Sequence, residues 1–116
     1  MNDIQLNQAL PDQAPTNQAP DVDEVLKAIS HPVRRDMLQW LKEPQLHFSP
    51  QHCSPELGVC AGQFERCGLS QSTVSAHLAT LQRAGLITSS KLGQWNYYKR
   101  NEEAIAAFVS RLSTAL

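Results

Sequence analysis

The stretch GLSQSTVSAHLATLQRAGLI, residues 68–87, decides the fold of this chain. Ser70 is a favoured N-cap and Gly85 can close a helix, so a helix is predicted between them, to about Ala84. Its large apolar side chains recur at i, i+4 and i+7, which are Val74, Leu78 and Leu81. Such a stripe must face the core. The opposite face of this helix is therefore polar and open to solvent.

The segments on both sides of this helix extend the pattern. A short helix is predicted over residues 59–67, and Gly68 can end it in a left-handed conformation, which makes the pair a helix-turn-helix. Residues 86–91 and 95–100 are β-prone runs joined by a Gly-containing turn, and they predict a β-hairpin. Side chains alternate along the second run, so one alternate pair is expected to pack on the body of the domain.

Three further helices are expected around this unit. Helical spacing of apolar residues predicts one helix from residue 22 and another from Pro32 to about Leu41. Asn101 is a favoured cap for a last helix with its own apolar stripe. The segment 44–58 shows no periodic pattern, which predicts a long loop.

These elements predict a single winged helix-turn-helix domain over residues 21–116. Its fold class is mainly α with a β-hairpin wing, with about five helices and two strands. A chain of 116 residues is long enough for one such domain with a modest core. Residues 1–20 are rich in Gln, Asn, Pro and Ala, and a disordered tail is expected there.

Charge and hydropathy narrow the class of protein. No apolar run approaches the roughly 18 residues of a membrane helix, and the N-terminus does not resemble a signal peptide. A cytoplasmic protein without membrane contact is therefore expected. The net charge is −1, yet residues 66–100 hold five basic and no acidic side chains. Clustered basic residues indicate a nucleic-acid-binding surface, and the alternative is a chance run of solvated charges.

The requirements of DNA recognition explain this order of elements. The second helix of a helix-turn-helix enters the major groove, so its outward face must be polar and unobstructed. Gln can bind adenine edges, Ser and Thr can contact bases or phosphates, and basic side chains on a hairpin can reach the flanking backbone. The expected partner is double-stranded operator DNA. The predicted contacts are Ser70, Gln71, Ser72, Thr73, Ser75, Ala76, Arg83, Lys91, Gln94, Lys99 and Arg100. For Gln71, Ser72 and Thr73, the alternative is a capping role alone.

Three segments carry a resemblance to a known family: HPVRRDMLQWL, GLSQSTVSAHLATLQRAGLI and GQWNYYKR. Together they resemble the ArsR-type winged helix-turn-helix regulators over roughly residues 22–116. The resemblance implies a homodimer held by the first and last helices. It also implies repression of a nearby operon until an effector weakens DNA binding. No residue pattern identifies that effector.

The same resemblance raises the question of a metal site. Residues 56–60, ELGVC, look like the Glu-Leu-Cys-Val-Cys motif with which family members bind metals or arsenite, but Gly58 replaces the first cysteine. The family's other common site needs Asp and His on the last helix, and the helix after Asn101 has no His. No metal and no cofactor are therefore expected. A zinc site at His47, His52 and Cys53 matches no strong spacing pattern.

The three cysteines leave three interpretations open. Cys60 and Cys67 are helically spaced with Phe64 and can be small core residues. Cys53 and Cys60 can instead form a thiol redox sensor, or all three cysteines, which are spaced seven apart, can form a metalloid site. On one intact helix, Cys60 and Cys67 would lie roughly 10 Å apart by the helical rise and could not share one ion.

The sequence also supports expectations about enzymatic activity, about protein binding and about His77, Arg34 and Arg35. There is no Gly-rich phosphate loop or paired-carboxylate motif, so the protein is not expected to be an enzyme. The alternative function is a winged-helix module that binds protein and not DNA. His77 lies at the edge of the buried face and is expected to be structural. Arg34 and Arg35 are expected either to pair with acids such as Asp36 or Glu65, or to contact phosphate.

Overall fold

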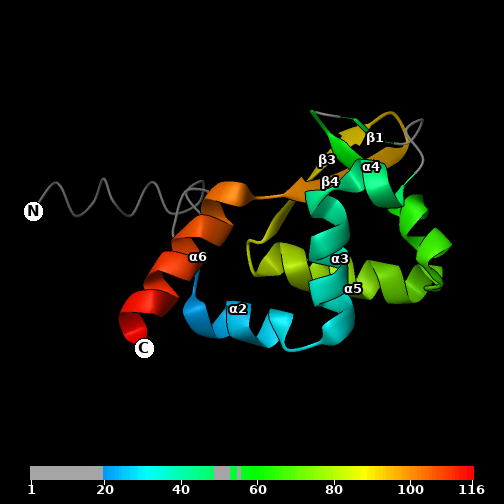
Figure 1. The fold of residues 1–116 in the computed structure, drawn as a ribbon. Coiled ribbons are helices and arrows are strands. Elements are labelled where there is room, and N and C mark those ends of the chain that lie inside the picture. The colour runs from blue at the N-terminus through cyan, green and yellow to red at the C-terminus, as the bar shows by residue number, and fades with distance from the viewer. Residues whose placement is uncertain (1–19, 49–52, 55) are drawn as a thin grey trace, which may run out of the picture.

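The computed structural model describes residues 20–48, 53–54 and 56–116 (Figure 1). Its helices are α2 (Val22–Ile29), α3 (Pro32–Lys42), α4 (Pro44–His47), the 3₁₀ helix η3 (Ala61–Cys67), α5 (Gln71–Arg83) and α6 (Glu102–Ala115). Its strands are β1 (Cys53–Ser54), β2 (Gly58–Cys60), β3 (Ile87–Leu92) and β4 (Trp95–Arg100). The predicted tail, apart from its last residue, lies outside the described residues.

Side chains cap the helices where the sequence places good capping residues. Ser70 Oγ accepts a hydrogen bond from the backbone N–H of Thr73 (3.3 Å), and Asn101 Oδ1 accepts one from Ala104 (3.1 Å). Both caps satisfy amide groups that have no partner within the helix. The helices α5 and α6 therefore begin where the sequence predicts.

The sheet is larger than predicted. The β3–β4 hairpin is confirmed, with Leu92 opposite Trp95 at its end, but β1 and β2 extend it to four antiparallel strands in the order β1-β2-β4-β3. The predicted loop over residues 44–58 also contains α4. Strands of two and three residues are too short to show alternation in the sequence.

A glycine makes the added strands possible. Gly58 has φ +104°, a conformation that favours glycine, and a Cβ there would collide with the backbone carbonyl of Tyr98. Since Val59 pairs with Tyr98 across β2 and β4, this close approach joins the segment to the wing. The glycine that stands in place of the family's cysteine is therefore required by the backbone.

The predicted helix over residues 59–67 is wrong at its start. Cys60 ends strand β2, and η3 begins one residue later. Gly68 ends η3 with φ 91°, as predicted. Since Cys60 and Cys67 do not share a helix, the separation expected from an intact helical rise does not apply.

The core lies between the helices and the inner face of the sheet. Val74, Leu78 and Leu81 of α5 are buried, as predicted. Phe64 of η3 packs edge-on against Phe48, with ring centroids 5.1 Å apart. At the far side of the core, α2 and α6 lie in contact (Figure 1). Within the described ranges no helix is long and apolar enough to cross a membrane.

Candidate nucleic-acid interface

The N-terminal half of α5 presents exposed side chains beside and opposite its buried stripe. Four of the predicted contacts form this surface, here called the α5 front: Gln71, Ser72, Ser75 and Ala76. Three are short, so a groove wall can approach the helix backbone closely. Arg83 is also exposed, in the last turn, where its guanidinium lies 3.5 Å from Thr80 Oγ1.

The hydroxyls of Ser70 and Thr73 are occupied by the cap. Ser70 Oγ donates to Thr73 Oγ1 (2.9 Å) while accepting from the Thr73 amide, and Thr73 is half-buried. Ser72 Oγ lies 3.4 Å from Ser70 Oγ at the exposed edge of this group. The capping role therefore accounts for Thr73, whereas Gln71 extends from the helix without a partner in the described part of the chain.

The end of the hairpin forms a second exposed surface. This wing tip comprises residues 91–95, and all five are exposed. Lys91 makes no hydrogen bond or ion pair with any described residue, and Gln94 lies in the turn. Trp95, which is 52% exposed, stands opposite Leu92. Of the two alternate pairs on β4, Asn96 and Tyr98 face the body, and Tyr98 packs against the core.

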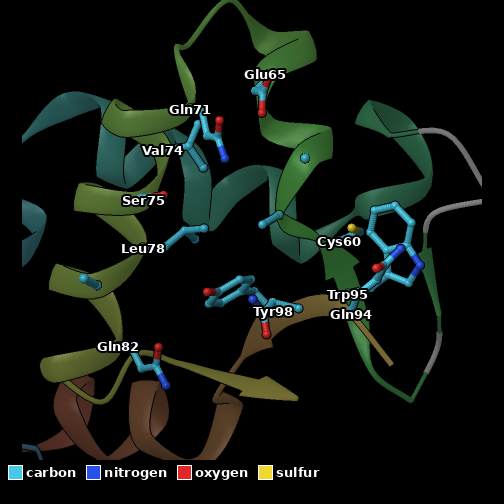
Figure 2. A pocket seen from close by; sticks show the side chains of 14 residues that line it. Cys60, Glu65, Gln71, Val74, Ser75, Leu78, Gln82, Gln94, Trp95 and Tyr98 are labelled. Atoms are coloured by element: carbon cyan, nitrogen blue, oxygen red, sulfur yellow. The ribbon is translucent and has the colours of Figure 1, made fainter. Parts of the chain in front are cut away.

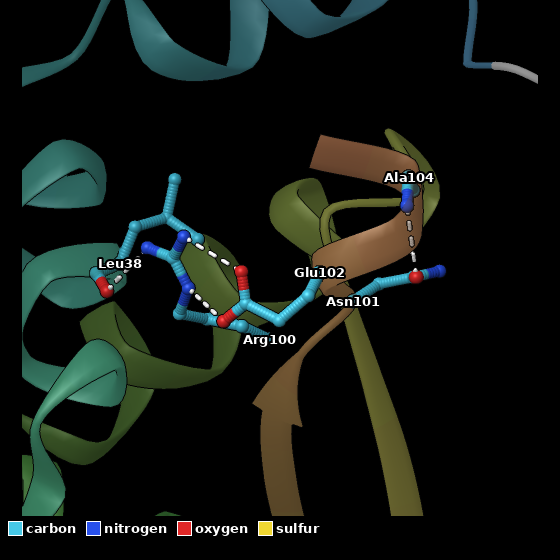
Figure 3. A network of polar contacts seen from close by, with 5 residues as sticks. All are labelled: Leu38, Arg100, Asn101, Glu102 and Ala104. Carbon is cyan, nitrogen blue, oxygen red and sulfur yellow. Dashed lines mark hydrogen bonds and ion pairs between the residues drawn. The ribbon is translucent and has the colours of Figure 1, made fainter. Parts of the chain in front are cut away.

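The opposite end of the hairpin holds its cations in internal contacts. This wing base comprises Lys99 and Arg100. Lys99 Nζ donates to the backbone carbonyl of Glu56 at 2.8 Å. Arg100 donates to both carboxylate oxygens of Glu102, at 2.7 and 3.1 Å, and to the backbone carbonyl of Leu38 at 3.2 Å (Figure 3).

The side chain of Arg100 is mostly buried and is paired with a carboxylate, so Arg100 stabilises the fold. Its side chain is only 13% exposed, whereas that of Glu102 is 68% exposed. The hydrogen bond from Arg100 lowers the pKa of the Glu102 carboxyl below its ordinary value, and burial opposes this only in part. The structure thus places two predicted phosphate contacts in bonds that join β4 to α3, α6 and the turn before β2.

The side chains of Arg34 and Arg35 donate hydrogen bonds to carbonyl groups at the C-terminus of α2. Arg34 Nε donates to the carbonyl of Ala28 (2.5 Å), and Arg35 donates to that of Ile29 (2.6 Å). Cations at a helix C-terminus interact favourably with its exposed carbonyls. The expected pairing of these arginines with Asp36 or Glu65 is wrong, because carbonyl groups take their place.

His77 has a structural partner, as predicted. Its Nδ1 lies 3.2 Å from an Arg34 guanidinium nitrogen, and its ring centroid lies 4.6 Å from that of His31. Burial, followed by the nearby His31 and Arg34, lowers the pKa of His77. His31 itself caps α3 through Nδ1, which accepts from the Val33 amide (3.2 Å). The sequence did not predict this cap, because histidine is not a usual N-cap residue.

The cysteines do not form a metal site within the described residues. No group of three His, Cys, Asp or Glu side chains in that part of the chain could hold a metal ion. Cys60 is 6% exposed, and burial raises the pKa of Cys67. The register sets Cys53 opposite Val59 in β1 and β2, and its side chain lies outside the described set, as does His52.

A family model and several known proteins are similar in sequence to this chain. The model of the family described as "Bacterial regulatory protein, arsR family" matches residues 64–89, which run from η3 into β3. The HTH-type transcriptional regulator YbzH of Bacillus subtilis is 44% identical over 96 residues, which are 80% of this chain and 96% of YbzH.

Two further proteins are similar over most of the chain. The putative arsenical resistance operon repressor ArsR2 of Halobacterium salinarum is 34% identical over 68% of this chain and 58% of its own length. The crystal structure of the predicted DNA-binding transcriptional regulator from E. coli has a TM-score of 0.54 and 33% identity. That similarity covers 97% of this chain and 98% of the E. coli chain.

Proposed function

This chain belongs to the arsR family of bacterial regulatory proteins and is a DNA-binding transcriptional regulator, and from that premise we propose that it is a homodimeric repressor that reads operator DNA with the α5 front. Transcriptional regulators of this family are not enzymes. The proposed regulator acts in the cytoplasm, with residues 21–116 as its working domain and residues 1–20 as a tail.

The exposed α5 front is the observation that carries this proposal. It combines the amide of Gln71, which has no partner among the described residues, with the hydroxyls of Ser72 and Ser75 and the small Ala76. A Gln side chain can bind the N6 and N7 atoms of adenine in the major groove. The buried face of the same helix fixes the position of these groups, because Val74 and Leu78 are in the core.

Contacts with the DNA backbone are assigned to the wing tip and to Arg83. Lys91 is exposed and unpaired within the described ranges, so its charge is available to a phosphate. Gln94 adds a neutral donor beside it. Lys99 and Arg100, which the sequence also placed at the DNA, are assigned a structural role in this proposal because internal acceptors hold them.

The dimer interface is assigned to α2 and α6. These helices contact each other and leave apolar side chains open, with Leu26 41% and Val109 57% exposed. Exposed apolar residues on neighbouring helices are typical of an interface. A two-fold dimer would present two α5 helices to half-sites about one DNA turn apart.

The repressor role rests on family membership and on the printed name of the Halobacterium relative. The signal that we propose for release of the operator is a peroxide. It takes two electrons from the thiols of Cys53 and Cys60, which form a disulfide, and the peroxide is reduced and takes up the two protons. Since Cys60 is buried, its oxidation requires that β2 first opens.

DNA recognition is tested by fluorescence anisotropy with a duplex from upstream of the protein's own gene and with a scrambled duplex. Replacing Gln71→Ala together with Ser75→Ala should reduce the preference for the specific duplex about 10- to 100-fold, since a bidentate base contact contributes about 1–3 kcal/mol. Gln39→Ala, an exposed amide on α3, is the matched control. An unchanged preference in the double variant would remove the assignment. No binding by the wild type would favour a protein-binding module.

The dimer is tested by analytical ultracentrifugation at micromolar concentration. Val109→Asp should convert the dimer to a monomer, because a carboxylate would be buried without a partner in an apolar interface. Thr114→Asp adds the same charge to α6 at an exposed position on a different face from Val109, five residues along the helix, and serves as the control. A wild-type chain that sediments as a monomer would contradict the proposed assembly.

A further inference from the structure

A pocket of about 380 Å³ opens between the helix-turn-helix and the wing (Figure 2). Its walls come from β2 and η3 on one side, from α5 on the second and from β4 on the third. Val74, Leu78 and Cys60 form its buried floor. The size falls within the range of ordinary small-molecule sites.

The charges around this pocket select against an anionic occupant. No Lys, Arg or His is among the described residues that line it, and the one charged side chain is the exposed Glu65. A phosphate group needs cations or convergent amide N–H groups. The pocket is therefore not a track for the DNA backbone, nor a site for a nucleotide phosphate.

The polar groups of the pocket are mostly side-chain amides. Gln71, Gln94 and Asn96 line it and have no hydrogen-bond partner within the described ranges. Gln82 donates through Nε2 to Ser89 Oγ at 2.9 Å, which fixes its amide and leaves its oxygen to accept. Amides that offer a donor and an acceptor side by side match the edges of nucleobases.

Aromatic rings complete the pocket. Tyr98 and Trp95 both line it from β4 (Figure 2). Tyr98 is half-buried against the core, so its ring is held in place, whereas Trp95 is 52% exposed at the outer edge. An aromatic face attracts the face of a planar heterocycle, at about 1–3 kcal/mol per stacked base.

We propose that this pocket binds an uncharged nucleobase or nucleoside. Its base ring contacts Tyr98 or Trp95, its edge bonds to Asn96 and Gln82, and a 5′-phosphate is excluded because the lining holds no cation and includes Glu65. Purine and pyrimidine edges both fit the amide chemistry, so the class is the nucleobase.

Occupancy of the pocket would act on DNA binding, and this second step rests on the proposed function. Gln71 and Ser75 belong both to the pocket and to the α5 front. A nucleoside that engages Gln71 removes that amide from base recognition. Since wing and α5 form opposite walls, an occupant also fixes their separation. A bound nucleoside therefore weakens operator binding.

Binding is tested first without DNA, by saturation-transfer NMR on the full chain. The probes are adenosine, guanosine, cytidine and uridine, each compared with its 5′-monophosphate. At least one nucleoside should show saturable binding, and its monophosphate should bind at least tenfold more weakly. Absence of binding by all four nucleosides would overturn the proposal, as would equal binding of nucleoside and monophosphate.

Matched variants locate the site. Asn96→Leu and Gln82→Leu should weaken nucleoside binding at least fivefold, while Gln39→Leu, an amide on α3 outside the pocket, should not change it. Circular dichroism checks that each variant folds. Equal binding by wild type and by Asn96→Leu and Gln82→Leu would place the ligand elsewhere and overturn the assignment.

The regulatory step is tested by operator anisotropy with and without saturating nucleoside. Wild-type affinity should fall at least fivefold, and that of Asn96→Leu should not change. Nucleoside binding without an effect on DNA would overturn the regulatory step alone. Failure of the ligand-free wild type to bind DNA would instead reject the proposed function, while the nucleoside site would stand on the NMR result.

Discussion

The two ends of the β3–β4 hairpin carry similar charges but differ in what surrounds them. At the wing tip, Lys91 is exposed and has no partner among the described residues. At the wing base, Lys99 binds a backbone carbonyl, and Arg100 binds Glu102 and Leu38. A basic residue on a wing therefore does not by itself indicate a DNA contact, because its neighbours in the fold determine whether its charge is available.

The position of each end explains the difference. The tip residues are exposed, and only the two-residue turn lies between Leu92 and Trp95. The base enters the domain where β4 meets the N-terminus of α6 and the middle of α3 (Figure 3). We therefore expect the base to contribute to stability and, under the proposed function, the tip to contribute to DNA binding.

The largest expected effect is on stability at the wing base. Arg100→Met should lower the free energy of unfolding by about 2 kcal/mol, because it removes the charge-assisted hydrogen bonds to Glu102 and the bond that joins β4 to the Leu38 carbonyl of α3. Urea unfolding monitored by circular dichroism measures the change. Lys91→Met, the matched change at the tip, should cost less than about 0.5 kcal/mol. Equal costs at the two positions would erase the distinction between tip and base.

A smaller effect, on DNA affinity, should appear at the tip. Lys91→Met should reduce the slope of log affinity against log salt concentration by about 1 per subunit, the contribution of one neutralised phosphate. Lys99→Met should change this slope less, since its ammonium group keeps its charge but is held at the Glu56 carbonyl. Anisotropy titrations across a salt series measure both. A lower slope in Lys99→Met alone would reverse the assignment.

The smallest expected effect concerns pH and the Arg100–Glu102 pair. Arg100 lowers the pKa of Glu102 below its ordinary value of 4.5, so the ionised carboxylate is favoured in the folded state. The resulting stabilisation is present above pH 4.5 and is lost as the pH falls through the lower folded pKa. It should remain under about 1 kcal/mol, because Glu102 is mostly exposed.

Acid unfolding of wild type and Glu102→Gln measures this contribution. The wild type should be more stable at neutral pH, and the difference should shrink as the pH falls through the lowered folded pKa of Glu102, where the carboxyl becomes protonated. Glu103→Gln is the control, since its carboxyl has no such partner among the described residues. A stability difference that grows on acidification would have the wrong sign for this pair.

Local signals in the sequence predicted the helix-turn-helix and the wing. The N-cap Ser70, the apolar spacing from Val74 and the left-handed Gly68 each depend on near neighbours in the chain. Strand β2 forms by pairing with β4, about 40 residues away, and the two-residue β1 pairs in turn with β2, so neither strand shows an alternation that the sequence could predict. In the sequence alone, Gly58 indicates only that a cysteine of the family motif is missing. The structure gives the reason for the glycine, because a Cβ at this position would collide with the carbonyl of Tyr98.

As with the fold, the sequence predicted only part of the candidate site. The α5 front follows from helical periodicity once the buried stripe is known. The roles of Arg100 and Arg34 do not, because each donates to a backbone carbonyl of another element, and such an acceptor carries no residue-specific signal. The sequence locates basic residues, and only the fold separates those that are exposed from those that bind within the protein.

The most direct test of this account is an amide NMR titration of the ¹⁵N-labelled protein with its operator duplex. Chemical-shift changes should concentrate at residues 71–76 of α5 and at Lys91 and Gln94 of the wing tip. The Nε–H signal of Arg100 should keep its position, since its bonds to Glu102 and Leu38 persist in the complex. Changes concentrated at Lys99 and Arg100, with the α5 front unaffected, would contradict the account.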